Sequence, residues 1–573
     1  TMDIGNDDFL KGRYVFAGNG GGKVSNAGVI NARDGGFVVL AGAEVSNSGL
    51  IQARLGDVAL GSGSAMTLDI GGDGLVNFVV DRAAVSDAAG IENLGEITAN
   101  GGVVVMAANV ARSLIGNAVN NAGRISAQSI EEHDGAIYLT ATGGDIVQTG
   151  TLDASGSGEA DGGTIRVIGD RNILLGDDAR ILARGADGGE VRLIAGHKLD
   201  TAAGSQIDVR THAGGNGGFV ELSGHQSFSA NGDVRIGQGG SLLIDPNDIK
   251  IVANGQSQCV GADSCFGTDS IESFLDDGVN VYVIAANSIT LESFGADNSL
   301  NSTGSGNLLF GIGSPASASL PNHNDGYGGT NFVQGSVTAT DGGFIRALSD
   351  DLEIDIGGYL EITGASNRGD VHVGNLRAAG IEINAADSIQ TGSLTATMDD
   401  VDLYAGRSIS IGGSVLAEND DILIIAEGGA VHVAGNVRAL SDSVEIYSAG
   451  DAEQFYGILI EGDVFGRGLI DLTADIGGIN VGNVSMEHGQ FDGGNGSLFM
   501  QAAGNILVEG LISAISDYGG VNIGLLSTGG SIELRGAQTE GGLASLIAES
   551  RYNDDQPSPG FSLAVVTLTA NQG

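Results

Sequence analysis

The sequence predicts an all-β fold built as a parallel β-helix, that is, a β-solenoid of stacked coils. Three observations lead to this prediction: a short turn-and-strand unit recurs along the chain, glycine is abundant, and segments with helical periodicity are nearly absent. Of the 573 residues, 99 are glycine and only 5 are proline. Glycine at this frequency, without a collagen period and with 42 % hydrophobic residues, suits a solenoid whose every coil needs tight corners.

The recurring unit is a polar residue, two glycines and a short β-favouring run, as in Asp34–Leu40. Asp and Asn tolerate a tight turn, glycine reaches positive φ without a steric penalty, and the residues that follow favour a pleated, half-buried surface. Each unit therefore predicts a turn followed by a strand. Further copies begin at Asn100, Asp161, Asp187, Asn216 and, more loosely, Asp341.

Residues 1–245 are expected to form a first β-helix. The segment Val24–Ala32 is echoed by Val45–Ala53, and later glycine pairs recur after somewhat longer intervals. These repeat lengths accommodate two or three short strands per coil. An antiparallel meander or sandwich also contains many short strands, but it does not need one strand to repeat the sequence of another.

Four asparagines of this first part occupy the same place in the repeat, two positions before a glycine: Asn26, Asn47, Asn93 and Asn121. Stacked asparagines can hydrogen-bond through their side-chain amides along the axis of a β-stack. We therefore expect an asparagine ladder at one corner of the coils rather than a ligand site.

Residues 246–345 are predicted to be an irregular segment that breaks or decorates the coil, because three of the five prolines fall here and interior β-ladders exclude proline. Both cysteines, Cys259 and Cys265, lie in the same segment. One close pair in a long chain points to a small disulfide loop formed in an oxidising compartment, and the alternative is two unrelated free thiols.

Residues 346–573 are expected to form a second β-helix, with about 23 residues per coil. His372 and His432 fall at equivalent positions of its repeats, which indicates structural periodicity rather than catalysis. The tripeptide Arg368, Gly369, Asp370 matches an integrin-binding motif and is placed at a turn, although such a match also arises by chance in a chain rich in glycine and aspartate.

The charge of the chain argues against one class of partner. A formal net charge of −46, from 71 acidic and 25 basic residues, repels nucleic acid unless basic residues cluster, and the sequence contains no run of Lys or Arg that could do so. We therefore expect no nucleic-acid partner. The acidity is expected to keep a long apolar-rich chain soluble.

Enzymatic activity is not expected from the motifs. The sequence contains no nucleophile elbow, phosphate-binding loop or zinc-protease motif, and it predicts no cofactor and no metal site. Polysaccharide-degrading β-helices place carboxylates on adjacent coils. Three clusters could do this, although acidic turn residues are more often simply solvated. They are Asp350, Asp351, Glu353 and Asp355; Asp399, Asp400 and Asp402; and Asp420 with Asp421.

Several segments resemble a known family. Thr1–Leu10, Tyr14–Phe16 and the Asn-x-Gly repeats resemble the later part of the secretion domain of filamentous haemagglutinin-type exoproteins, and Ser241–Ile249 is similar to the Leu-hydrophobic-Asp-Pro segment that follows it. The resemblance covers residues 1 to about 310 and is generic beyond. It implies a right-handed parallel β-helix, export through an outer-membrane two-partner secretion transporter, and a role as an adhesin.

The leading expectation is thus a secreted, rod-shaped adhesin at the surface of a Gram-negative bacterium, whose receptor on a host cell, a bacterium or another surface is not identified. The first alternative is a structural filament subunit that self-associates end to end. The second alternative is a polysaccharide-degrading β-helix enzyme.

Overall fold

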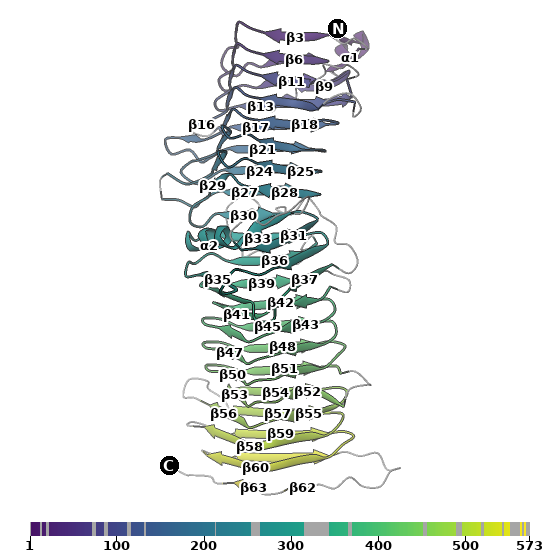
Figure 1. Cartoon of the computed structure of the whole chain (residues 1–573), viewed down its shortest axis with the longest axis vertical. Helices are drawn as coiled ribbons and strands as arrows, with labels where there is room; N and C mark the ends of the chain where they lie inside the picture. Colours follow the sequence, from purple (N-terminus) through teal and green to yellow (C-terminus); the bar gives the residue numbers. More distant parts are fainter. Residues whose placement is uncertain are drawn as a thin grey trace. The chain divides into compact units, whose positions relative to one another are not determined.

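The computed structural model of the chain is a parallel β-helix, so the predicted fold class is confirmed (Figure 1). It comprises two compact units, the first formed by Thr1–Lys250 with Asn254–Ile284 and the second by Ile251–Ala253 with Ala285–Gly573. The structure describes residues 2–11, 14–18, 22–70, 76–84, 90–111, 116–130, 133–212, 214–253, 264–313, 343–364, 369–450, 455–488, 496–516, 521–540, 544–550, 562–563 and 566–568. No helix among these residues is long and apolar enough to cross a membrane.

Each regular coil of unit 1 contributes one strand to each of three parallel sheets, and strands of one sheet lie one below the next in Figure 1. The first sheet contains β5 (Val38–Gly42), β8 (Val58–Ser62), β13 (Val103–Asn109), β17 (Ala136–Thr142), β21 (Thr164–Gly169), β24 (Glu190–Ala195), β27 (Phe219–Gly224), β30 (Ser241–Ile244) and β33 (Asn280–Ala285). The second contains β3 (Lys23–Asn26), β6 (Glu44–Asn47), β11 (Gly90–Asn93), β14 (Asn117–Asn121), β18 (Asp145–Gln148), β22 (Ile173–Leu175), β25 (Lys198–Thr201), β28 (Ser227–Ala230) and β32 (Cys265–Gly267). The third contains β4 (Val29–Asn31), β7 (Leu50–Gln52), β12 (Glu96–Thr98), β15 (Arg124–Ser126), β19 (Thr151–Asp153), β23 (Arg180–Leu182), β26 (Gln206–Asp208) and β29 (Asp233–Arg235).

Aliphatic side chains fill the interior of unit 1 and stack from coil to coil. On the third sheet, Ile51, Ile97, Ile125, Leu152 and Ile181 are consecutive register partners. All five side chains are 0 % exposed. Each added coil therefore removes apolar surface from water, which stabilises the stack by about 25 cal/mol per Å².

The predicted asparagine ladder is confirmed. Asn26, Asn47, Asn93 and Asn121 are joined by side-chain amide hydrogen bonds of 2.9, 2.8 and 2.7 Å, and Asn121 donates in turn to Gln148 Oε1 at 2.8 Å. The side chains of Asn47, Asn93, Asn121 and Gln148 are 0 % exposed. A buried amide must find a partner, and here each amide finds it on the next coil.

The glycine of the Asn-x-Gly pattern is required at this turn for a separate structural reason. Asn47 Oδ1 also accepts from the backbone N–H of Gly49 at 3.3 Å, which holds the turn. The glycines of successive coils lie in contact, so that a Cβ added at Gly95 would lie 2.1 Å from the carbonyl oxygen of Gly49. Only glycine allows the backbones to approach this closely.

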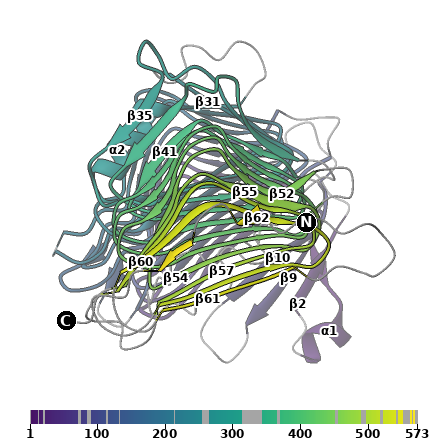
Figure 2. The same ribbon diagram turned by 90° about the horizontal axis from the view of Figure 1, so that it is seen from below.

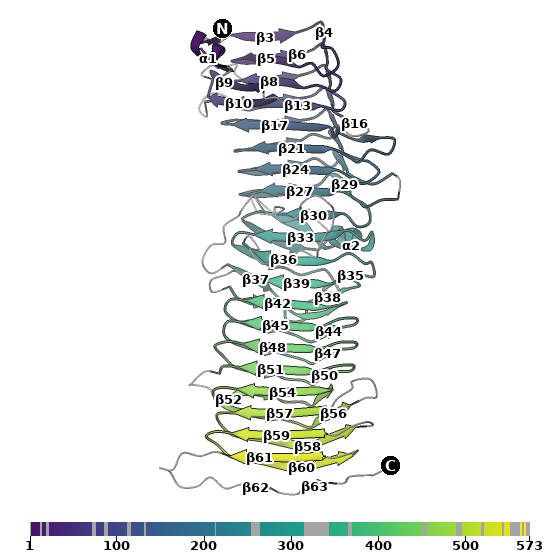
Figure 3. The ribbon, with the colours of Figure 1, turned by 180° about the vertical axis from the view of Figure 1, so that it is seen from behind.

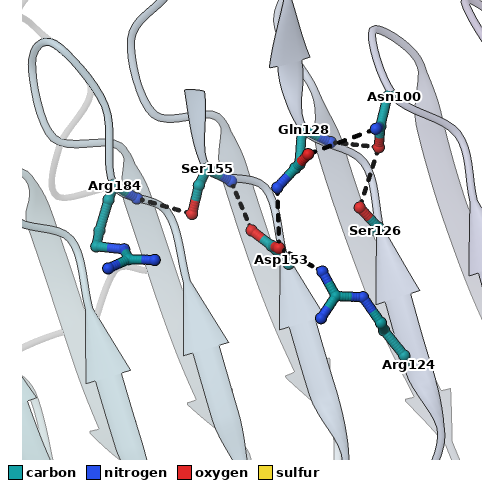
Figure 4. Close-up of polar contacts among 7 residues, drawn as sticks. All are labelled: Asn100, Arg124, Ser126, Gln128, Asp153, Ser155 and Arg184. Atoms are coloured by element: carbon teal, nitrogen blue, oxygen red, sulfur yellow. Dashed lines mark hydrogen bonds and ion pairs between the residues drawn. The ribbon is translucent and has the colours of Figure 1, made fainter. Parts of the chain in front are cut away.

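A polar network links four successive coils at a corner of unit 1 (Figure 4). Asp153, only 5 % exposed, accepts from Arg124 Nη2 at 2.7 Å and from Gln128 Nε2 at 3.0 Å. Its other carboxylate oxygen accepts from the backbone N–H of Ser155 at 3.1 Å. These contacts compensate the buried charge. Asn100, Ser126 and Arg184 extend the network.

Additional elements of unit 1 were not predicted. Near the amino terminus an antiparallel sheet is formed by β1 (Asp3–Ile4), β2 (Tyr14–Ala17), β9 (Ala65–Ile70) and β10 (Val76–Arg82), with helix α1 (Asn6–Leu10) between the first two. A two-stranded parallel sheet joins β16 (Ser129–Ile130) to β20 (Gly156–Ser157).

Unit 2 also uses three strands per coil, seen from behind in Figure 3. On its first face are β36 (Leu308–Ile312), β39 (Leu360–Thr363), β42 (Ile381–Ala385), β45 (Val401–Ala405), β48 (Ile422–Ala426), β51 (Val444–Ser448), β54 (Leu469–Ala474), β57 (Gly496–Ala502), β59 (Val521–Ser527) and β61 (Ala544–Ser550). The second strands are β34 (Ser288–Leu291), β37 (Phe344–Ala347), β40 (Val371–His372), β43 (Ile389–Thr391), β46 (Ile409–Ile411), β49 (Val431–Val433), β52 (Tyr456–Ile460) and β55 (Gly478–Val481). The third strands are β35 (Ser299–Ser302), β38 (Glu353–Ile356), β41 (Asn375–Ala378), β44 (Leu394–Ala396), β47 (Val415–Ala417), β50 (Val437–Ala439), β53 (Val464–Arg467) and β56 (Val484–His488).

The second and third strands merge in the last coils of unit 2. There β58 (Ile506–Ser516) and β60 (Ile532–Glu540) each pair along both rows, and β60 also pairs with β62 (Ser562–Leu563) and β63 (Val566–Leu568). Viewed along the stack, β54, β57 and β61 lie on one face and β52 and β55 on another (Figure 2). His372 and His432 are connected in register through Gln390 and Ser410, so their predicted equivalence is confirmed.

The described part of segment 246–345 is more regular than expected. Strand β31 (Asp248–Val252) contains the division between the units, β33 pairs with β30, and β34, β35 and β36 pair with later strands of unit 2. Helix α2 (Thr268–Asp276) buries Ile271 and Leu275. The proline argument predicted a break, but Pro246 does not interrupt a strand because β30 already ends at Ile244. Pro315, Pro321 and Cys259 lie outside the described residues.

Candidate functional site

Three carboxylates stand in line on the outer face of unit 2, and we call them the carboxylate ladder: Glu361 on β39, Glu382 on β42 and Asp402 on β45. They are consecutive register partners. The neighbours of Glu361 on its strand, Leu360 and Ile362, are buried, so strand alternation directs Glu361 outward. With neighbouring strands about 4.8 Å apart, the first and last backbone positions of the ladder lie about 10 Å apart.

Two carboxyl groups of the ladder, those of Glu361 and Asp402, have raised pKa values. Burial raises the pKa of Glu361 to about 7, and the charge of Glu382 contributes in the same direction. Burial also raises the pKa of Asp402 to about 6, followed by the charges of Asp400 and Glu382. Thr363 Oγ1 donates to Glu361 at 3.1 Å and Asn384 Nδ2 donates to Glu382 at 2.7 Å. Carboxyl groups with such pKa values can act as general acid and base.

Beside the ladder, the turns that precede β45 and β48 gather further aspartates. One carboxylate oxygen each of Asp399, Asp400 and Asp420 lies within 4.8 Å of the other two, and Asp420, Asp421 and Asp442 form a second such group. Burial and the charge of Asp420 raise the pKa of Asp400, while a hydrogen bond from the backbone N–H of Asp421 lowers it. These are oxygen-only groups of the kind that hard cations prefer.

The structure thus brings together two of the three acidic clusters identified in the sequence. The third is dispersed: Asp350 pairs with His372 at 2.8 Å and Asp355 lies 3.6 Å from Arg377. Sequence reasoning missed Glu361 and Glu382. Their spacing along the chain is close to the length of one coil, but coil length varies, so this spacing alone does not predict that they align.

The other predicted site residues are only partly within the described residues. Arg368 of the tripeptide lies outside them, Gly369 is buried, and the exposed Asp370 accepts from the backbone N–H of Ser388 at 3.3 Å. Cys265 is disulfide-bonded and 1 % exposed. Cys259 lies outside the described residues, so its pairing with Cys265 stays a prediction.

A shallow apolar hollow of about 340 Å³ lies further along the same face of unit 2. Gly524 lines it, together with its register partners Phe499 and Ile547, which are 44 % and 64 % exposed. Because Gly524 has no side chain, the Phe499 ring leans over it, and a Cβ there would meet the ring at 2.8 Å. Asp471 and Gln501 also line the hollow and add polar groups to its wall.

Comparison of the sequence with known families and with curated proteins brings no assignment: no family model matches the chain, and neither does any curated protein.

Proposed function

We propose that this protein is a secreted attachment protein, an adhesin, displayed at the surface of a Gram-negative bacterium after export through an outer-membrane two-partner secretion transporter. The observation that carries the proposal is the combination of coils paired strand to strand with exposed apolar groups on an outer face. A backbone paired in this way resists unfolding and proteolysis. Exposed apolar patches rimmed by polar groups are typical of interaction sites.

The hollow at Gly524 is the attachment surface that we propose, and a glycan is its ligand class. An aromatic ring such as Phe499 can lie against the apolar face of a sugar, while Asp471 and Gln501 can hydrogen-bond its hydroxyl groups. An open, shallow site of this kind suits a unit within a longer chain of sugars. Attachment would then depend on many weak contacts that act together.

We expect beads coated with the purified protein to attach saturably to epithelial cells, sister bacteria or immobilised polysaccharide. Phe499→Ala should reduce attachment at least tenfold, which corresponds to about 1.4 kcal/mol. Phe455→Ala, which removes a ring that is 71 % exposed elsewhere on unit 2, is the matched control. Attachment to no surface, with fibres between beads instead, would refute the adhesin and favour the filament subunit. A deletion of residues 250–330 would be a poorer test of attachment than these single substitutions, because it would remove the strands β33 to β36 from the stack.

Polysaccharide hydrolysis is the second candidate, and the carboxylate ladder is the observation that favours it. Glycosidases use two carboxyl groups, about 5–5.5 Å apart when they retain and about 6.5–9.5 Å apart when they invert the configuration. The backbone positions of adjacent ladder residues are about 4.8 Å apart and those of the two outer residues about 10 Å apart, which is close to these separations. The raised pKa of Glu361 suits a general acid.

Reducing-end release from a panel of polysaccharides between pH 5 and 8 tests this candidate. If it is correct, Glu361→Gln and Asp402→Asn should each lower the rate at least a hundredfold. Glu445→Gln, which lies on the same line two coils beyond Asp402, should leave the rate unchanged. Absence of reducing ends from every substrate would exclude hydrolysis of the polysaccharides tested.

A further inference from the structure

The peptide bond between Asp245 and Pro246 lies in an unusual environment, because the aspartate is buried. It follows β30 directly, and Asp245 is 4 % exposed although it carries a carboxyl group. Its Oδ1 has no hydrogen-bond partner, alone among the buried side-chain polar atoms of the described residues. A buried carboxyl group with an unpaired oxygen is costly for the fold, and a chemical role is one explanation for such a group.

The surroundings of Asp245 favour the protonated form of its carboxyl group. Glu221 on β27 is 3 % exposed and already engaged, since it accepts from Arg192 Nη1 at 2.9 Å and from Ser223 Oγ at 3.1 Å. Burial, together with the charge of Glu221, raises the pKa of Asp245 to about 8. The flanking segments also carry Tyr282 on β33, His225 after β27, and Asp248 and Lys250 on β31. Burial lowers the pKa of His225.

The residue after Asp245 makes this bond susceptible. Proline provides a tertiary amide, and its nitrogen leaves as a secondary amine when the bond breaks. The aspartate side chain can reach its own backbone carbonyl carbon through a five-membered ring, so that attack is intramolecular. Asp245–Pro246 is the one Asp–Pro bond in the sequence.

We propose that Asp245–Pro246 is a self-cleavage site, at which the aspartic acid side chain breaks its own peptide bond. A carboxyl oxygen of Asp245 forms a bond to its own backbone carbonyl carbon, the bond from that carbon to the Pro246 nitrogen breaks, and the carboxyl proton passes to this nitrogen. The product is a cyclic anhydride on Asp245. Water then adds to the anhydride and restores two carboxyl groups, so the net reaction is hydrolysis, with water as the one added reactant.

Cleavage would leave the two products held together. Strand β30, in the amino-terminal product, pairs in parallel with β33, in the carboxy-terminal product, as well as with β27. Pro246 also lies shortly before Lys250, where the first segment of unit 1 ends. The expected product is thus a nicked protein whose cut becomes visible only after denaturation.

The test incubates the purified full chain at 37 °C between pH 5 and 10 and measures denatured samples by mass spectrometry. We expect fragments of residues 1–245 and 246–573, with a rate that is constant below pH 8 and falls roughly tenfold per pH unit above it. Hydroxylamine should convert the new carboxyl terminus into a hydroxamate by trapping the anhydride. Asp245→Asn should abolish the cut, and Pro246→Ala, which keeps the carboxyl group, should slow it at least tenfold.

Two results would overturn the proposal. One is an intact chain after several days at pH 7, with circular dichroism showing that the protein stays folded. The other is cleavage at the same rate in chain unfolded by urea at pH 7, because intrinsic lability of an Asp–Pro bond would then account for it without the buried environment. Neither result bears on attachment, so this proposal and the proposed function fail independently.

Discussion

Replacing Asp245 by asparagine should stabilise the folded protein at neutral and alkaline pH by on the order of 4 kcal/mol, with little effect below pH 4. The folded pKa of about 8 lies above the ordinary value of 3.8. The folded state therefore binds a proton that the unfolded state has released. Stability from this group is full below pH 3.8 and is lost as the pH rises to 8, and asparagine removes this loss.

Thermal unfolding of the two proteins at pH 4 and pH 8.5 measures the effect. At pH 8.5 the midpoint of unit 1 should rise by roughly 5–10 °C in the variant. Asp178→Asn, which changes an exposed aspartate in a turn of the same unit, should shift the midpoint by less than about 1 °C. Equal midpoints for Asp245→Asn and the unchanged protein at both pH values would show that Asp245 does not titrate abnormally.

Replacing Asn93 by alanine should destabilise unit 1 by about 2–6 kcal/mol. Asn93 is 0 % exposed and joins two hydrogen bonds of the asparagine ladder. Its removal leaves the side-chain N–H of Asn47 and the carbonyl oxygen of Asn121 without their partners. An unsatisfied buried polar group costs about 1–3 kcal/mol, and alanine also leaves a cavity.

Hydrogen exchange and urea unfolding test this prediction. Exchange should accelerate most in the coils of β6, β11 and β14, because each coil of a solenoid is stabilised chiefly by its neighbours. Asn93→Gln should be less harmful, since Gln148 already occupies the end of the same ladder. If the Asn93→Ala and Asn93→Gln variants both unfold at the same urea concentration as the unchanged protein, the ladder does not stabilise the fold.

Features that repeat in the sequence could be predicted, because a parallel solenoid places equivalent residues of successive coils side by side. Asn26, Asn47, Asn93 and Asn121 share one sequence context, and the structure places them in one line. The same holds for His372 and His432.

The carboxylate ladder could not be predicted in this way. Glu361, Glu382 and Asp402 each stand between two aliphatic residues, but this pattern recurs in other strands of unit 2, and their two spacings along the chain are not equal. Their alignment depends on how many residues each turn takes up between strands. Coil length varies from one coil to the next. For example, fewer residues separate Ile422 from its register partner Val444 than separate Val444 from its next partner, Ile470. Spacing alone therefore does not define the register.

The sequence by itself determined the parallel β-helix, the aliphatic interior and the asparagine ladder. Each depends on a pattern repeated in every coil, and many copies of one pattern reinforce the same stacked arrangement. Only the tertiary structure decided which outward side chains meet and which are buried. Asp245 reads in the sequence as an ordinary polar residue beside a proline. The fold buries it next to Glu221, and desolvation by that burial gives its carboxyl group the unusual pKa.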